Sequence, residues 1–217
     1  MTGSDPPCGR DELAAHFGNI DIYLFDQLLR GRITSQMRIL DAGCGHGRNS
    51  HYLMRCGAEV FGIDADPAEI CEIQTLAGRL APALPAENFA VGRLTELPFP
   101  DGHFAAVVCS AVLHFAKDES EFEQMVAEMW RVLGGGGLFF ARLASTIGIE
   151  DRVRRLRGRT HHLPDGSDRF LVDEEYLLRA TSALGGDLVD PLKTTNVQNL
   201  RAMTTWVVVK RRTSAGG

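Results

Sequence analysis

The segment LDAGCGHGRNS, from Leu40 to Ser50, places three glycines at alternate positions after a short apolar run. Glycine lets the backbone turn sharply and approach a ligand with no side chain in between. The spacing matches neither the GxGxxG pattern of dinucleotide-binding loops nor the phosphate-binding P-loop. A loop of this composition either cradles a cofactor or forms a flexible turn, and its spacing alone leaves both open.

An acidic residue ends the next apolar run. Asp64 closes the segment AEVFGID (residues 58–64), 23 residues after Asp41. In alternating α/β folds, ligands bind at the carboxyl ends of the strands, and an acid there can accept hydrogen bonds from ribose hydroxyls. The glycine loop together with Asp64 therefore predicts a nucleoside-binding site.

Apolar runs and amphipathic segments alternate along the chain. Strands are predicted over residues 37–43, 58–64, 88–93, 103–113 and 137–144, and over 186–192 and 202–211 as an antiparallel hairpin. Helices are predicted over residues 11–33 with a break at Gly18 and Asn19, and over 48–57, 67–81, 120–133 and 173–184. We therefore expect an α/β fold: a Rossmann-like, doubly wound, mostly parallel sheet of seven strands, with one antiparallel strand near the edge and helices on both faces.

Composition limits the possible classes of function. The net charge of −5 argues against a nucleic-acid partner, because no global basic surface is available to neutralise phosphates. Residues 1–10 lack a signal-peptide pattern, and no apolar run reaches the roughly 20 residues that span a bilayer, so we expect a cytoplasmic protein without membrane contact. Five scattered cysteines without a CxxC pair indicate reduced thiols, and we expect no metal site.

Four motifs, in order across residues 37–145, resemble the class I S-adenosylmethionine-dependent methyltransferases. They are LDAGCGHGRNSHYL, VFGIDADP, LPFPDGHFAAVVCSAVLHF and EMWRVLGGGGLFFARL. The resemblance implies S-adenosylmethionine as methyl donor and S-adenosylhomocysteine as product. S-adenosylmethionine carries no phosphate, which agrees with a glycine segment that lacks the pattern of a phosphate-binding loop. GCGHGRNS and MTTWVVVKR also resemble the small tellurite-resistance-type branch of this family.

The resemblance also implies where the cofactor binds. Asp41 and the backbone from Gly43 to Gly45 would face its methionine end, Asp64 its ribose and Ala65 its adenine. The other expected cofactor-binding residues are Ala42, Cys44, Arg48, Asn49, Leu94, Thr95 and Cys109. Family members often carry an acid just before the LPF segment. Here Arg93 stands at that place and cannot accept a hydrogen bond, which leaves the partner of the adenine amino group open.

A small-molecule acceptor is expected, because no added domain for recognising protein, DNA or RNA is visible. His114 follows the fourth predicted strand and is the candidate general base; alternatively it packs against the cofactor or bonds a backbone carbonyl. Tyr23, His114, Phe115 and Arg142 are the candidate substrate-binding residues. Three activities remain open: O- or N-methylation with His114 as base, methylation of a thiol or chalcogen that needs no base, and cofactor binding without turnover.

We expect an N-terminal helical cap (residues 1–36), a methyltransferase domain (37–212) and a flexible tail (213–217), forming a monomer or homodimer. Residues 146–170 are predicted to be an inserted loop or cap rich in arginine. That segment either binds an anionic acceptor or is a solvated surface. Its arginines are Arg152, Arg154, Arg155, Arg157, Arg159 and Arg169.

Overall fold

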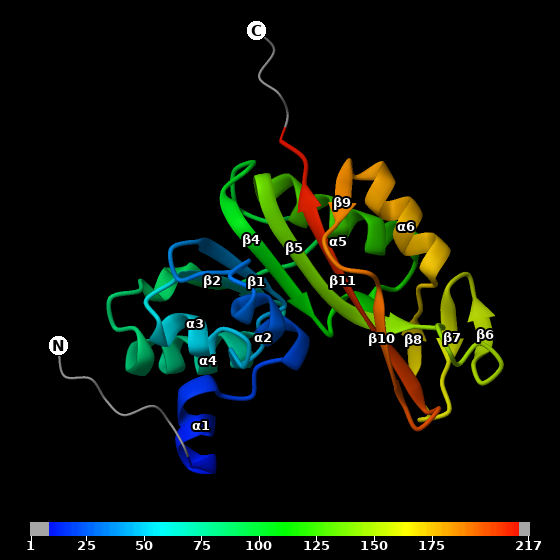
Figure 1. Ribbon diagram of the computed structural model, residues 1–217, viewed down its shortest axis with the longest axis horizontal. Coiled ribbons are helices and arrows are strands. Elements are labelled where there is room, and N and C mark those ends of the chain that lie inside the picture. Colours follow the sequence, from blue (N-terminus) through cyan, green and yellow to red (C-terminus); the bar gives the residue numbers. More distant parts are fainter. Residues whose placement is uncertain (1–8, 213–217) are drawn as a thin grey trace, which may run out of the picture.

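A twisted mixed sheet forms the centre of the computed structural model, which describes residues 9–212 (Figure 1). Its strand order is β10-β11-β5-β4-β1-β2-β3, with β9 also paired to β11. These strands are β1 (Arg38–Ala42), β2 (Glu59–Asp64), β3 (Phe89–Val91), β4 (Phe104–Ser110), β5 (Leu133–Ser145), β9 (Gly186–Leu188), β10 (Lys193–Val197) and β11 (Arg201–Lys210). β1 is parallel to β2 and β4, whereas β11 is antiparallel to β5. The Rossmann-like prediction is therefore confirmed.

The sheet has eight strands rather than the predicted seven, because residues 186–197 contribute two short ones. β9 pairs with the end of β11 at Val208 to Lys210, and β10 pairs with its start at Arg201 to Thr205. The predicted antiparallel pairing of the last two segments is correct for β9. β10 (sequence KTTNV) lacked the apolar alternation on which the strand predictions relied.

Helices cover both faces of the sheet, and four of the six that the structure describes begin after an aspartate whose side chain caps them. The helices are α1 (Arg10–Phe17), α2 (Ile22–Leu29), α3 (His51–Arg55), α4 (Pro67–Leu80), α5 (Glu119–Val132) and α6 (Glu174–Ala183), with the short 3-10 turns η1 (Ala86–Asn88) and η2 (Leu113–Phe115). Asp66, Asp118 and Asp173 each cap the helix that follows by accepting a backbone N–H. None of the described helices is long and apolar enough to cross a membrane.

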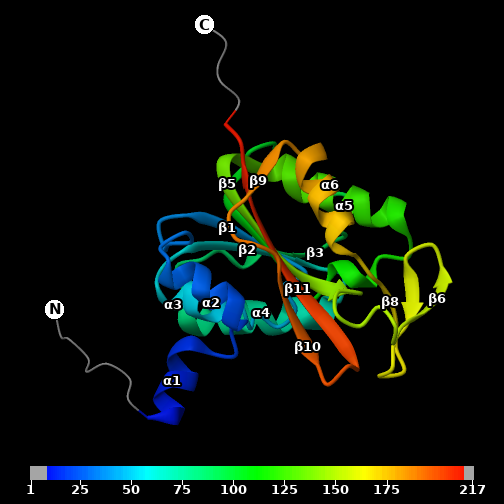
Figure 2. The same ribbon diagram turned by 45° about the vertical axis from the view of Figure 1, so that its right-hand side comes forward.

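Alternation along each strand builds two separate apolar layers. Figure 2 shows α5 and α6 on one side of the sheet and α2, α3 and α4 on the other. Phe139 and Trp206 face α5 and α6, whereas their neighbours Phe140 and Val207 face α2, α3 and α4. All four side chains are almost fully buried. A strand buried on both faces needs a nearly continuous apolar sequence, as β4 and β5 have.

Residues 146–170 form a small antiparallel sheet instead of an irregular loop. Its strands are β6 (Arg154–Arg157), β7 (Thr160–His162) and β8 (Asp168–Phe170). Figure 1 shows this sheet beside the carboxyl end of β5 and the tip of the β10–β11 hairpin. β8 packs against η2, so one edge of the insertion reaches the carboxyl end of the central sheet.

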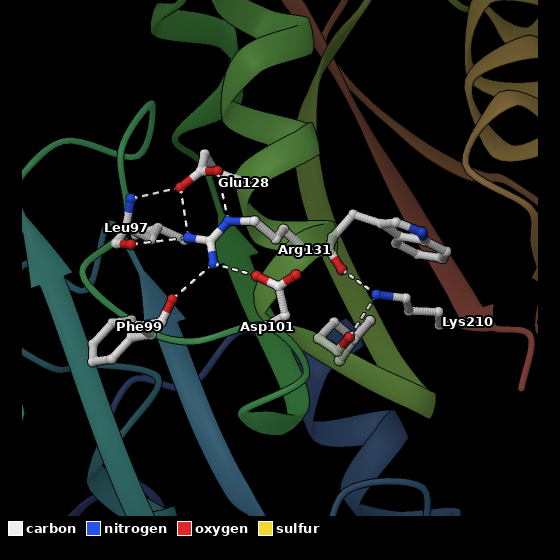
Figure 3. Close-up of polar contacts among 8 residues, drawn as sticks. Leu97, Phe99, Asp101, Glu128, Arg131 and Lys210 are labelled. Carbon is white, nitrogen blue, oxygen red and sulfur yellow. Dashed lines mark hydrogen bonds and ion pairs between the residues drawn. The ribbon is translucent and has the colours of Figure 1, made fainter. Parts of the chain in front are cut away.

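Arg131, near the end of α5, holds the loop between β3 and β4 against that helix (Figure 3). Its guanidinium donates to the carbonyls of Leu97 and Phe99 and to the Asp101 and Glu128 carboxylates, at 2.8–2.9 Å. Glu128 also accepts the Leu97 N–H at 2.8 Å. Backbone groups with no strand partner are thereby satisfied, and the start of the same loop is fixed beside the cavity described next.

Candidate functional site

A cavity of about 830 Å³ opens at the carboxyl ends of β1, β2 and β4. That edge is where ligands bind in open α/β sheets, and the volume lies within the usual range for small-molecule sites, roughly 300–1,000 Å³. Ten residues predicted from the sequence line it: Gly43, Cys44, Gly45, Arg48, Asn49, Asp64, Ala65, Leu94, Thr95 and Phe115. The glycine segment is therefore part of a binding cavity.

The glycine turn has a backbone that other residues adopt only with strain. Gly43 has φ +78°, and a Cβ placed there would collide with the Val112 side chain at the end of β4. The N–H groups of Gly43 and Cys44 both donate to the Ile63 carbonyl, at 2.8 and 3.1 Å. The turn is thus packed against β2 and β4 and is not a mobile linker.

Asp64 at the end of β2 orients the turn while keeping capacity for a ligand. Its Oδ2 accepts the Gly45 N–H at 2.9 Å, and its Oδ1 accepts the Asp66 N–H at 3.0 Å. A carboxylate has about four acceptor positions, so two remain on the cavity side. These two could accept a pair of adjacent hydroxyls.

Asp41 lies directly beneath the turn and is 2% exposed. Its Oδ2 accepts from Ser50 Oγ at 2.7 Å, while its Oδ1 is buried without a hydrogen-bond partner among the described residues. Burial raises the pKa of this carboxyl to about 7, against the smaller opposing effects of Ser50 and Arg48. A ligand group that is cationic or donates a hydrogen bond would stabilise the buried, unpartnered Oδ1 of Asp41.

The opposite wall is largely apolar. Leu94, Val112 and Met125 line it, and Ala65 lies at its exposed edge. Arg93 also lines the cavity, but its side chain is 75% exposed and lies 3.5 Å from Glu121. A flat ring system can therefore pack against this wall without displacing a buried charge.

Near the other end of the cavity, the Asp21 carboxylate pairs with two arginines. This carboxylate caps α2 by accepting the Tyr23 N–H at 2.9 Å. Arg142 Nη1 donates to it at 3.0 Å, and Arg48 Nη2 and Ser110 Oγ lie 3.5 and 3.4 Å away. Because two guanidiniums share one carboxylate, this part of the site keeps a net positive charge.

Tyr23 and Arg142, predicted to bind substrate, do not line the cavity. The Tyr23 hydroxyl lies 2.6 Å from Thr195 Oγ1, and the Arg142 guanidinium is 5.3 Å from the centre of the Tyr23 ring. These contacts hold both side chains behind Asp21. Any effect of Tyr23 or Arg142 on a ligand would therefore be exerted through Asp21.

His114 is poorly arranged to act as a base. It is 8% exposed, and its Nδ1 accepts a long hydrogen bond from the Ala144 N–H at 3.4 Å. Burial, with smaller effects of Arg169 and Arg201, lowers its pKa to about 4. With Nδ1 accepting, Nε2 carries the proton of the neutral ring and cannot take another from an acceptor.

Two further expected cofactor contacts lie in the apolar core. Ala42 and Cys109 are both fully buried in the layer that faces α5 and α6, and neither lines the cavity. Cys109 was expected to bind the cofactor, but side chains alternate along β4. Cys109 therefore lies in this core, whereas the next residue, Ser110, lines the cavity. Burial also raises the pKa of the Cys109 thiol, which keeps it protonated.

One group of side chains near the cavity has ligand atoms suited to a metal. His46, Glu69 and Glu72 bring a nitrogen and two carboxylate oxygens within 4.8 Å of one another. His46 and Glu72 are exposed, and His46 Nδ1 is 3.2 Å from Glu69 Oε2. Exposed groups of this kind are common without a metal, so we assign none.

Residues 40–141 match a protein family described as a methyltransferase domain. The matched segment makes up just under half of the chain and contains the glycine turn and Asp64. An uncharacterized methyltransferase of Synechocystis sp. is 32% identical over 107 residues, which cover 49% of this chain and 47% of that relative. A ubiquinone biosynthesis O-methyltransferase of Azorhizobium caulinodans is 29% identical over 198 residues, covering 85% of this chain and 72% of the relative. The chain thus spans about half the length of the first of these two proteins.

The fold of the chain is shared with solved structures. The crystal structure of 1,6-didemethyltoxoflavin-N1-methyltransferase from Burkholderia thailandensis, which contains S-adenosylhomocysteine, superposes with a TM-score of 0.66. The two chains are 18% identical, and the superposition covers 90% of this chain and 79% of the other. This similarity establishes a common Rossmann-like fold.

Several residues that line the cavity were not identified from the sequence. They are His46, Asp66, Glu69, Gly92, Ser110, Ala111, Val112, Glu121 and Met125. Ser110 and Ala111 directly follow the apolar run of β4, so the end of that run was a signal for them. Glu121 and Met125 come from α5, and only the packing of α5 beside the cavity identifies them.

Proposed function

We propose that this chain is an S-adenosylmethionine-dependent methyltransferase that methylates a small molecule by in-line displacement. The observation that carries the proposal is the cavity lined by the glycine turn and Asp64, with the buried, unpartnered Oδ1 of Asp41 directly before that turn in the chain. The methyltransferase-domain match over residues 40–141 spans all three.

The cavity fits each part of this cofactor. Two adjacent ribose hydroxyls suit the remaining acceptor positions of Asp64, and an adenine ring suits the wall of Ala65, Leu94 and Met125. An α-ammonium would satisfy the buried Oδ1 of Asp41, and an α-carboxylate would lie toward Arg48. A Cβ at position 43 would collide with the side chain of Val112, a residue that lines this cavity, which accounts for glycine there.

The bound cofactor supplies a methyl group on a sulfonium, which is already a good leaving group. Positioning the acceptor opposite that group and excluding water are therefore the main tasks of the protein. Leu94, Val112 and Met125 exclude water from the apolar side. Asp21 holds Arg48 at the polar side, with Arg142 as a positioning residue behind it.

The environment of His114 favours acceptors that need no base from this residue. A carboxylate is already ionised near neutral pH, and a thiolate or another soft anion needs no further proton loss, whereas an aliphatic hydroxyl or an ammonium must lose a proton. The resemblance of GCGHGRNS to the tellurite-resistance-type branch adds a chalcogen species to this group. The alternative is a cofactor-binding module without turnover, which Arg93 suggests because it stands where the family often has an acid. The Arg93 side chain is 75% exposed and lies 3.5 Å from Glu121.

Two measurements test the proposal. Isothermal titration calorimetry should detect binding of both S-adenosylmethionine and S-adenosylhomocysteine, and no binding of either would refute it. A screen for S-adenosylhomocysteine release against thiols, chalcogen species, phenols, amines and carboxylates should then give turnover with one class. Binding without turnover by any class would favour the non-catalytic module.

A further inference from the structure

The mouth of the cavity carries an exposed aromatic ring. Phe115 lies on η2, directly after β4, and lines the cavity while 62% of its surface remains exposed. A single exposed apolar side chain is common on protein surfaces and shows nothing by itself. Its position beside the ligand cavity makes its other contacts informative.

Arg169 of β8 covers part of this ring. Its guanidinium carbon lies 4.8 Å from the centre of the Phe115 ring, within the range of a cation–π contact. Nη1 donates to the Asp168 carbonyl at 2.7 Å, and no carboxylate of the described residues forms an ion pair with Arg169. A guanidinium without a carboxylate partner among the described residues therefore stands next to an aromatic ring that contacts His114 and is still 62% exposed.

The other five arginines of the insertion lie elsewhere. Arg159 pairs with Asp173 at 2.8 Å and stacks on Tyr176, and Arg155 donates to the Gly158 carbonyl. Arg152 lies beside Asp151 at 3.5 Å, while Arg154 and Arg157 are exposed on β6. Among the six, all of which the structure describes, Arg169 is the one that contacts a residue lining the main cavity.

The charge around Phe115 is positive. Arg169 and Arg201 both lower the pKa of the buried His114, after the larger effect of burial. They also add to the effect of Ser167 in lowering the pKa of Asp165. Across the mouth, Glu121 is already paired with Arg93 and Lys117.

We propose that Phe115 and Arg169 recognise the methyl acceptor, and that this acceptor is a flat aromatic organic anion. Its ring stacks on Phe115, and its carboxylate accepts hydrogen bonds from the Arg169 guanidinium. Arginine suits this role because its planar donors match a carboxylate in pairs. The inference rests on the proposed function, since it assigns the acceptor side of the same cavity.

Calorimetry on the full chain saturated with S-adenosylhomocysteine tests the pairing. The probes are para-hydroxybenzoate, its neutral amide, and the saturated hydroxycyclohexane carboxylate, which together separate charge from ring stacking. We expect para-hydroxybenzoate to bind at least about tenfold more tightly than either analogue. Equal affinities, or no binding by any probe, would overturn the inference.

Variants assign the effect to the two residues. Arg169→Gln should weaken para-hydroxybenzoate about tenfold and leave the amide unchanged, whereas Arg154→Gln on the same small sheet should change neither. Phe115→Leu should reduce the preference for the aromatic ring over the saturated one. An Arg169 variant with unaltered affinities would contradict the proposal. Failure to bind S-adenosylhomocysteine would instead refute the proposed function, so the two failures are distinguishable.

Discussion

The Asp21 carboxylate accepts a hydrogen bond from Arg142 Nη1 at 3.0 Å, joining the N-terminal helices to the carboxyl end of β5. The Asp21 side chain is 2% exposed and that of Arg142 19%. Removing one partner of a pair buried to this degree leaves a charge that neither water nor protein compensates. The pair therefore fixes the N-terminal segment beside the cavity.

Asp21→Asn tests this link, because asparagine keeps an oxygen for the Tyr23 N–H and loses only the charge. We expect a loss of about 2–4 kcal/mol in the free energy of unfolding, measured in urea. The matched control is Asp26→Asn on the same helix, whose partner Arg30 is 46% exposed and whose loss should cost less than about 1 kcal/mol. Similar losses in both variants would contradict a special role for Asp21.

A second prediction concerns two glycines with the same backbone conformation. Gly43 and Gly57 both have φ +78°, but an added Cβ meets Val112 at position 43 and nothing within 4 Å at position 57. Gly57→Ala should cost about 1–2 kcal/mol from the left-handed backbone alone. Gly43→Ala should cost more and weaken S-adenosylhomocysteine binding at least about tenfold.

Val112→Ala provides the rescue in this comparison. It removes the two methyl groups that the new Cβ would strike, so the double variant Gly43→Ala/Val112→Ala should regain part of the lost affinity. Calorimetry and urea unfolding of the single and double variants measure both effects. If the double variant is as impaired as Gly43→Ala, steric collision is not the cause.

Local patterns in the sequence were sufficient to predict most of the fold. Continuous apolar runs marked β4 and β5, and apolar residues at helical spacing located α4, α5 and α6. The ends of β1 and β2 then placed the glycine turn and Asp64 at one edge of the sheet. These features depend on neighbours within a few residues, which a sequence displays directly.

Long-range contacts set the limit of that prediction. Nothing near Asp21 indicates Arg142, which is 121 residues away, and nothing distinguishes Arg169 from the other arginines of its segment. Cys109 was misplaced because β4 is apolar on both faces, so its sequence does not show which residues face the cavity. Only the packed structure resolves such choices.

Asp41 makes the stability of the unliganded protein fall as pH rises. Its pKa is about 7 in the folded chain, above the ordinary value near 3.8, so the folded state binds the proton more tightly. The resulting stabilisation is present below the unfolded pKa and is lost as pH rises through 7. Relative to the wild type, Asp41→Asn should therefore gain about 3 kcal/mol in unfolding free energy between pH 5 and pH 8.

Urea unfolding of both proteins at the two pH values measures that gain, and the difference between them cancels the titration of all other groups. A constant difference would show that Asp41 titrates normally. In the same variant, S-adenosylhomocysteine should bind more weakly, because a neutral amide replaces the carboxylate beneath the glycine turn. Unchanged affinity would contradict the assignment of Asp41 to the α-ammonium.

Unlike Asp41, His114 should make the stability of the protein rise as pH rises. Its pKa is lowered to about 4 in the folded chain from an ordinary 6.5, so the stability that it contributes is present above pH 6.5 and is lost as pH falls through 4. His114→Asn should relieve about 2 kcal/mol of this loss between pH 7 and pH 5, by the same urea measurement. The effects of Asp41 and His114 partly cancel in the wild type, so a flat wild-type profile is consistent with both.

The same variant decides whether His114 is a base. A residue that stays uncharged and hydrogen-bonded between pH 6 and pH 9 does not titrate there, so it adds no rising or falling limb to the pH profile of kcat. With an acceptor found in the screen, the pH profile of kcat for His114→Asn should keep its shape between pH 6 and pH 9, and kcat should fall less than about tenfold. Loss of a limb near pH 6.5 together with a fall of 100-fold or more, of the size that general-base catalysis supplies, would restore His114 as the base.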